Sequence, residues 1–241
     1  MNIPVLTGLI KRRFLINFRI NPEVLERFLP EPFQPQLVNG YGIGGICLIR
    51  LENIRPKRSP IKCGLNSENA AHRFAVTWPD GEGVYVPRRD TDSLLSHLTG
   101  GRIFPGVHHR AHFDVQEEDE HFEFSMMARD RSTTVTFEGS RAEALPEDSC
   151  FSSVQEASDF FENGSIGYSD AHEAGSYDGL QLATESWSVT PLHIEKVASS
   201  FLSDKSLFPE GSVTFDHALL MENIEHEWHA LEPVCCKDAV H

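Results

Sequence analysis

The 241-residue chain has no apolar run near the roughly 20 residues that a membrane-spanning helix requires. It also has no G-x-S-x-G, P-loop or G-x-G-x-x-G fingerprint, which excludes the best-known motifs for acyl hydrolysis, phosphate cradling and dinucleotide binding. The first basic residues follow apolar residues at the N-terminus, the reverse of their order in a secretory signal. These absences predict a soluble, cytoplasmic protein that does not bind membranes.

Cysteine is sparse and irregularly placed. The five cysteines are Cys47, Cys63, Cys150, Cys235 and Cys236, and none of them forms a C-x-x-C pair. An odd number with two adjacent thiols fits neither a disulfide framework nor a zinc ribbon. We therefore expect reduced thiols, with the adjacent pair near the C-terminus as the site most open to oxidation.

Positive charge is scarce in the second half of the chain. Residues 1–110 carry 15 Lys and Arg against 9 Asp and Glu, whereas residues 111–241 carry 6 against 27. The net charge of −15 argues against sequence-independent binding of nucleic acid, which needs a surface that neutralises phosphates. The split favours an acidic exterior around a pocket whose walls are positive enough to attract a small anion.

Hydrophobic patterns predict many strands and few helices. Phe14, Ile16 and Phe18 alternate in a strand over residues 12–20, Asn21-Pro22 starts a short helix, and Asn39-Gly40 is typical of a hairpin turn. Further strands are expected at 41–51, 70–78, 84–86, 107–115, 121–128, 133–141, 181–189 and 213–221, and further helices at 90–98, 153–161 and 195–202. Without a βαβ rhythm, this order predicts a single α+β domain, mainly β, built on an antiparallel sheet or barrel.

Several polar residues occur in phase with the apolar residues of these strands. Arg12 is in phase with Phe14, and Glu68 and His72 are in phase with Phe74. In the same way, His109 shares the phase of Phe113, and His217 that of Phe215. Buried charged groups are costly unless they are paired, and a Glu beside an Arg or His in an apolar interior is typical of an acid/base or carboxylate-binding site. Separate core or rim positions for the five remain the alternative.

A metal site is not favoured by the run His108-His109-Arg110-Ala111-His112. On a strand, His108 and His112 lie about 13 Å apart, too far to share one ion. His226 and His229 flank an apolar stripe, and a surface position is expected for them. We therefore expect no bound metal and no cofactor.

Several segments together resemble the acetoacetate decarboxylase-like superfamily. They are Phe18-Arg19 through Leu29-Pro30-Glu31-Pro32, Glu68 ahead of Ala75-Val76-Thr77-Trp78, Asp92 to Phe104-Pro105, and Phe215-Asp216-His217-Ala218. The resemblance runs in order along nearly the whole chain. It implies one domain over residues 1–241, an antiparallel cone-like β-barrel or curved sheet that encloses a pocket, with short peripheral helices, in a homo-oligomer. It also places the active-site glutamate at Glu68 and the active-site arginine within Lys11 to Arg13, where periodicity selects Arg12.

One feature of that superfamily is missing. In the decarboxylases a pair of lysines follows the aromatic-Pro step, and the first forms a Schiff base. Here Phe104-Pro105 is followed by Gly106-Val107, and no lysine lies between Lys62 and Lys196. Arginine does not replace it, since it stays protonated. The chain therefore resembles an uncharacterised branch without Schiff-base chemistry.

The sequence favours two functions equally, and in both the protein binds a small anionic or keto-acid ligand. In the first, the protein is a lyase, hydratase or isomerase in which Glu68 and His109 are catalytic and Arg12, His72 and His217 bind the substrate. In the second, it is a non-catalytic barrel that binds a small ligand. A metal-dependent hydrolase using Glu68, His72 and His109 is less favoured.

Overall fold

The computed structural model describes residues 4–60, 63–94, 106–171 and 173–235. The chain folds mainly as strands, and the predicted class is confirmed. The first half contains β1 (Leu6–Ile20), α1 (Pro22–Phe28), β2 (Gln34–Pro35), β3 (Leu37–Val38), β4 (Tyr41–Pro56), β5 (Leu65–Trp78) and β6 (Gly81–Thr91). The second half contains β7 (His108–Glu118), β8 (His121–Ala128), β9 (Thr134–Arg141), α3 (Val154–Asn163), β10 (Ile166–Asp170), β11 (Ser176–Thr184), β12 (Thr190–Ser199) and β13 (Val213–Cys235).

Local sequence signals account for the ends of several elements. Asn21 caps α1 through Oδ1, which accepts a hydrogen bond from the backbone N–H of Val24, and Ser153 caps α3 in the same way through Glu156. Asn39 and Gly40 both have positive φ angles, 48° and 83°, between β3 and β4. The hairpin turn predicted at this dipeptide is therefore present.

Two expectations about elements were wrong. Asp90 and Thr91 end strand β6 and do not cap a helix, and residues 95–105 lie outside the described part of the chain. Residues 195–199 belong to strand β12, because this segment pairs with β9. The predicted curved sheet is present, and its pairings are antiparallel except that β6 pairs in parallel with both β10 and β7.

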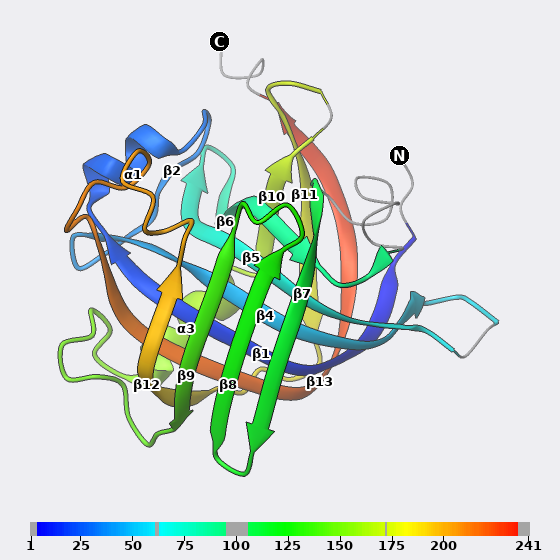
Figure 1. Ribbon diagram of the computed structural model, residues 1–241. Helices are drawn as coiled ribbons and strands as arrows, with labels where there is room; N and C mark the ends of the chain where they lie inside the picture. Colours follow the sequence, from blue (N-terminus) through cyan, green and yellow to red (C-terminus); the bar gives the residue numbers. More distant parts are fainter. Residues whose placement is uncertain (1–3, 61–62, 95–105, 172, 236–241) are drawn as a thin grey trace.

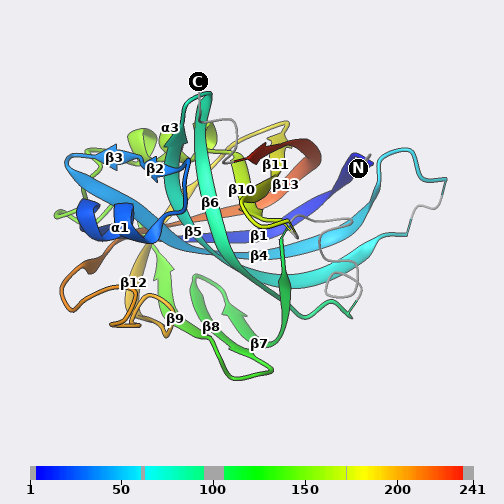
Figure 2. The same ribbon diagram turned by 90° about the horizontal axis from the view of Figure 1, so that it is seen from above.

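The pairings close the sheet into two rings that share their long strands. One ring runs β6-β5-β4-β1-β13-β12-β9-β8-β7 and returns to β6. The other runs β6-β5-β4-β1-β13-β11-β10 and also returns to β6. Figure 1 shows the meander β7–β9 crossing in front of the long strands, and Figure 2 shows β10, β11 and α3 on their other side.

Both faces of the shared strands are consequently buried. Phe14 and Ile16 of β1 and Phe74 of β5 belong to a core that includes Phe124 and Phe137 of the meander. Leu15 of β1, with Cys47, Leu219 and Phe161 of α3, belongs to a second core on the other face. Among the described residues, no helix is long and apolar enough to cross a membrane.

Candidate functional site

A cavity of about 130 Å³ lies on the second face of the shared strands. An engineered cavity of about 150 Å³ binds benzene, so this space suits a small organic molecule. Its apolar wall comes from β4, β6 and β11, with Ile49, Leu51, Val84, Val86, Leu180 and Leu182. Its polar groups are Arg13, Cys47, Ser67, Asn69, Arg73, Arg89, Asp90, His108, Ser165 and the indole of Trp228.

Three arginines give the cavity its charge. Arg13 donates to sulfur atoms, from Nε to Sγ of Cys47 at 3.3 Å and from Nη1 to Sδ of Met221 at 3.9 Å. Arg89 donates from Nε and Nη2 to Oγ of Ser169 at 3.1 and 3.0 Å. Arg73 donates from Nη2 to Oδ1 of Asn17 at 2.6 Å. The acceptors are thus two sulfur atoms, a hydroxyl oxygen and an amide oxygen, and none of them is a carboxylate.

Within the described part of the chain, none of these three arginines has a carboxylate partner within salt-bridge distance. Asp90, the acidic group on the cavity wall, is held by the neighbouring Arg88, which donates to it at 2.9 and 2.8 Å. Burial lowers the pKa values of Arg73 and Arg89 to about 10, so both side chains remain protonated at neutral pH. The cavity therefore carries uncompensated positive charge.

A buried chain of hydrogen bonds fixes the position of Arg73. Nδ1 of His217 contacts Oδ2 of Asp216, and Nε2 of His217 lies 3.1 Å from Nδ2 of Asn17. Because Asp216 is an acceptor, Nδ1 carries the ring proton, and Nε2 accepts the hydrogen bond from the Asn17 amide. The amide oxygen of Asn17 is thereby turned towards Arg73. Burial lowers the pKa of His217, which agrees with the neutral ring that this chain of contacts requires.

Other contacts hold Asp216 and Arg73, the two ends of this series of hydrogen bonds. Asp216 also accepts hydrogen bonds from Ser149 and the Cys150 backbone N–H, and these contacts help to lower its pKa to about 2, against the effect of burial. The Arg73 guanidinium stacks 4.7 Å from the ring centroid of Phe161 on α3. At Gly45, the β4 partner of Asn17, a Cβ atom would lie 2.4 Å from the Ile16 carbonyl oxygen. Only glycine permits β4 to approach β1 this closely.

The five residues predicted from the sequence do not gather around this cavity. Arg12 and Glu68 face the first core, where Nη2 of Arg12 donates to Oε2 of Glu68 at 2.7 Å and Nη1 contacts Glu117. Burial raises the pKa of Glu68, and attraction to Arg12 offsets part of this rise. The phase of Arg12 with Phe14 was predicted correctly. The cavity lies on the opposite face, where Arg13 takes its place.

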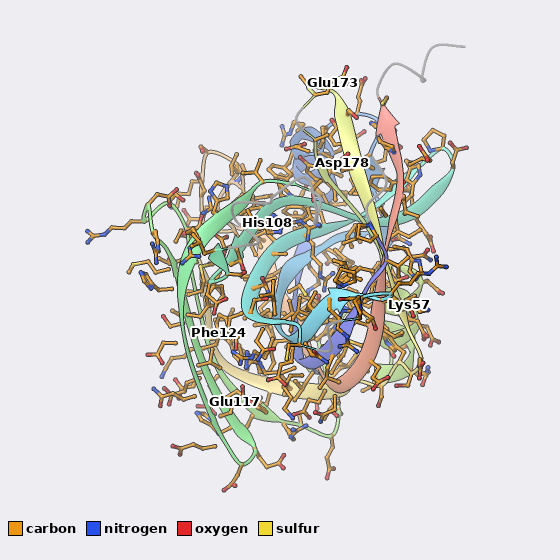
Figure 3. The ribbon with its side chains drawn as sticks, turned by 90° about the vertical axis from the view of Figure 1, so that its right-hand side faces the viewer. Lys57, His108, Glu117, Phe124, Glu173 and Asp178 are labelled. Atoms are coloured by element: carbon orange, nitrogen blue, oxygen red, sulfur yellow. The ribbon has the colours of Figure 1, made fainter. Side chains whose placement is uncertain are left out.

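The three histidines are also separated. His72 lies in the first core, with Nε2 2.8 Å from Oγ of Ser199, and burial lowers its pKa to about 3. His217 is on the cavity side and reaches the cavity only through Asn17 and Arg73. His109 follows His108, and it is His108 that lines the cavity. Figure 3 shows His108 at one end of β7 and Glu117, the partner of Arg12, at the other.

No metal site forms from Glu68, His72 and His109 in the described residues. The one group there with ligand atoms close enough to share an ion is His121, Glu123 and Glu138, at the outer surface of β8 and β9. Glu138 is already paired with Lys196, whose Nζ lies 2.6 Å from Oε2. His226, expected at the surface, is buried, and burial lowers its pKa to about 4.

Sequence reasoning missed Asn17, Cys47, Arg73 and Arg89 as cavity residues, and within Lys11 to Arg13 it selected Arg12 and not Arg13. Arg13 and Asn17 alternate with the residues that were selected, and they share the phase of Leu15. The signal that could have identified them is that polar residues also occur on the second face of β1, a strand that is buried on both faces. The pair Arg88-Arg89 in β6 also indicated an arginine on the second face, because two adjacent residues in one strand point to opposite faces.

Comparisons with known proteins agree with this architecture. The sequence matches the family DUF2071, described as an uncharacterized conserved protein, over residues 10–222. Among solved structures, an acetoacetate decarboxylase-like enzyme from Sphingomonas wittichii RW1 has a TM-score of 0.60 at 10% identity, over 97% of this chain and 95% of that chain. The acetoacetate decarboxylase of Legionella pneumophila has a TM-score of 0.62 at 11% identity, over 97% and 90%.

A third solved structure is that of the enduracididine biosynthesis enzyme MppR complexed with pyruvate. It has a TM-score of 0.57 at 10% identity, over 98% of this chain and 92% of that chain. No curated protein matches the sequence. At these identities the structural likeness shows the fold, and it confirms the predicted resemblance to acetoacetate decarboxylase-like proteins.

Proposed function

The chain belongs to the DUF2071 family, and we propose that within this family it binds a small organic anion, of the 2-oxo acid class, in the arginine-lined cavity. The observation that carries the proposal is the set of three cationic side chains, Arg13, Arg73 and Arg89, facing one cavity without a carboxylate partner in the described part of the chain. Buried charge is costly unless it is paired. A carboxylate ligand would supply the missing counter-charge.

The ligand class follows from the form of the cavity. Guanidinium groups hold carboxylates through paired, charge-assisted hydrogen bonds. The remaining wall is mostly apolar, and the space admits only a small molecule. The pyruvate complex of MppR, which has the same fold, supports a 2-oxo acid as the first ligand to test.

The proposed chemistry does not use a lysine imine. Each described lysine forms a hydrogen bond or an ion pair with another side chain, and none of them lines the cavity. These lysines are Lys11, Lys57, Lys196 and Lys205. The aromatic-Pro step at Phe104-Pro105 lies outside the described residues, but the sequence there continues with Gly106-Val107. A lyase, hydratase or isomerase would act on the bound acid through His108, the one histidine on the described cavity wall.

Calorimetry with pyruvate tests the binding. We expect saturable binding that weakens as ionic strength rises, with acetate weaker and the neutral analogue acetone undetectable. Equal affinities for acetone and pyruvate would show that the arginines do not recognise the carboxylate of the ligand. Borohydride treatment with pyruvate should give no reduced lysine adduct, whereas a stable adduct would restore the Schiff-base mechanism. Release of a product from a panel of 2- and 3-oxo acids would identify an enzyme, and retention without turnover would identify a binding protein.

A further inference from the structure

Cys47 is the one cysteine on the described wall of the cavity. It lies in the middle of β4, paired with Leu15 of β1 and Ala71 of β5. Ala71 also lines the cavity, and its side chain is small. Cys47 therefore lines the space in which the anion would bind, and it is not part of a disulfide.

The surroundings of this sulfur are cationic. Nε of Arg13 donates a hydrogen bond to Sγ at 3.3 Å. Arg73 and Arg89 line the same cavity as Cys47. Reactive cysteines occur in electropositive environments with access from outside, whereas structural cysteines lie in apolar surroundings.

A separate observation indicates that a ligand touches this place. Arg73 is only 4% exposed, it lines the cavity, and its Nε atom has no hydrogen-bond partner. A buried donor without an acceptor is costly, and such a group calls for an explanation, of which contact with a bound ligand or water is one. Arg73 follows two residues after Ala71, the β5 partner of Cys47, and therefore lies on the same face of the sheet. An oxygen atom of a ligand at Arg73 would bring its neighbouring carbon into the space beside Cys47.

We propose that Cys47 forms a reversible covalent bond with the carbonyl carbon of a 2-oxo acid, an inference that rests on the proposed binding function. The sulfur adds to C2 of the acid, so that an S–C bond forms and the C=O π bond breaks. The π electron pair moves to the carbonyl oxygen, which takes up the proton that leaves the thiol. The product is a thiohemiketal, and no oxidant, reductant or further reactant is required.

The arginines suit the carboxylate of this product and the alkoxide that develops while the S–C bond forms. A carboxylate and a developing alkoxide are both stabilised by guanidinium donors in a site that excludes water. The cysteine would thus provide the covalent contact that an imine-forming lysine provides elsewhere in this fold. No group other than those already on the cavity wall takes part.

Two of the other described cysteines, Cys150 and Cys63, lack this environment. Burial, with Asp216 nearby, raises the pKa of Cys150 to about 12. Cys63 is exposed, so it serves as the reference for an ordinary accessible thiol. If a reagent reacts faster with Cys47 than with exposed Cys63, the preference is therefore due to the cavity and not to solvent access.

Pyruvate labelled with ¹³C at C2 tests the proposal by NMR on the full chain. In the wild-type protein we expect a bound C2 signal that moves from the ketone region to the region of a tetrahedral carbon bearing sulfur. The signal should be lost in Cys47→Ser and Cys47→Ala, while calorimetry still detects weaker pyruvate binding by both variants. Cys63→Ser is the matched control and should keep the signal.

Alkylation by bromopyruvate, in which sulfur displaces bromide, gives an independent readout in the wild type. We expect labelling at Cys47 to be at least about tenfold faster than at Cys63, since a cationic cavity concentrates anions, and to be suppressed by pyruvate. With neutral iodoacetamide the preference should reverse. If pyruvate binds, but C2 stays a ketone and Cys47 is not labelled first, the covalent proposal is wrong and the binding function stands. If pyruvate does not bind at all, both are wrong.

Discussion

Asn17 accepts a hydrogen bond from Arg73, with Oδ1 and Nη2 separated by 2.6 Å, and this contact joins the cavity to a buried Asp216–His217 pair. The amide cannot rotate without losing both neighbours, because its Nδ2 atom donates to His217 and to the Leu15 carbonyl oxygen. A cavity arginine is thus held in place by groups that do not touch the cavity. The contact also leaves the positive charge of Arg73 uncompensated, because the amide oxygen is neutral.

Asn17→Asp should compensate the positive charge of Arg73 while keeping the shape of the side chain at position 17. The new carboxylate would pair with Arg73 and compete with an anionic ligand. We expect pyruvate affinity to fall by about tenfold or more, which corresponds to loss of one charge-assisted hydrogen bond. Calorimetry measures the affinity, and thermal unfolding should show a folded protein. Asn66→Asp makes the same chemical change at an exposed position and should leave binding unchanged.

Arg89→Met should move stability and binding in opposite directions. Arg89 is partly buried and donates only to a serine hydroxyl in the described part of the chain, so its charge lacks a carboxylate partner there. Replacing such a charge by an apolar side chain of similar volume is neutral or stabilising. We expect a Tm that is unchanged or higher, with pyruvate affinity weakened by about tenfold or more. Exposed Arg27→Met is the control for the loss of one positive charge. A lower Tm with intact affinity would assign Arg89 a structural role.

Glu68→Gln separates a structural role from a catalytic one. Glu68 pairs with Arg12 in the first core, away from the cavity. We expect a loss of about 1–3 kcal/mol in the free energy of unfolding, since Arg12 loses a buried charged partner but keeps Glu117. Pyruvate affinity and any turnover should stay at the wild-type level. Denaturant titration and calorimetry measure the two effects, with exposed Glu26→Gln as control. Loss of turnover at wild-type stability would return Glu68 to the chemistry.

Acid should destabilise the fold through its buried histidines. The pKa of His72 is lowered from 6.5 to about 3 and that of His226 to about 4, in both cases mainly by burial. As the pH falls below about 6.5, the unfolded chain binds protons that the folded chain does not. Stability is therefore lost between about pH 6.5 and 4, by about 1.4 kcal/mol per pH unit for each such histidine.

His72→Phe tests this assignment. The ring of His72 lies 4.6 Å from that of Phe201, so phenylalanine can fill the position, although the contact with Ser199 is lost. The variant should be less stable at pH 7 and should lose stability less steeply between pH 6.5 and 4, as measured by urea unfolding at each pH. Exposed His193→Phe should retain the wild-type slope. An unchanged slope in His72→Phe would contradict the neutral state of this ring.

Local chemistry was sufficient to predict several elements. The α1 cap at Asn21, the turn at Asn39-Gly40 and the meander of β7, β8 and β9 depend on contacts within a few residues, and all are present. Strand β12 was predicted partly as a helix because its sequence lacks clear alternation. Its conformation is set by pairing with β9 and β13, which lie far from it in the sequence.

The sequence by itself determined the side-chain phase of β1, in which Arg12, Phe14 and Ile16 share one face. It also determined the supply of arginine, since Arg13, Arg73 and Arg89 all come from the basic first half. Only the tertiary structure decided which face meets the cavity. The strand alternates with a period of two, and α3, β10 and β11 cover one face while the meander covers the other. When both faces of a strand are buried, alternation no longer distinguishes a packed core from a binding site.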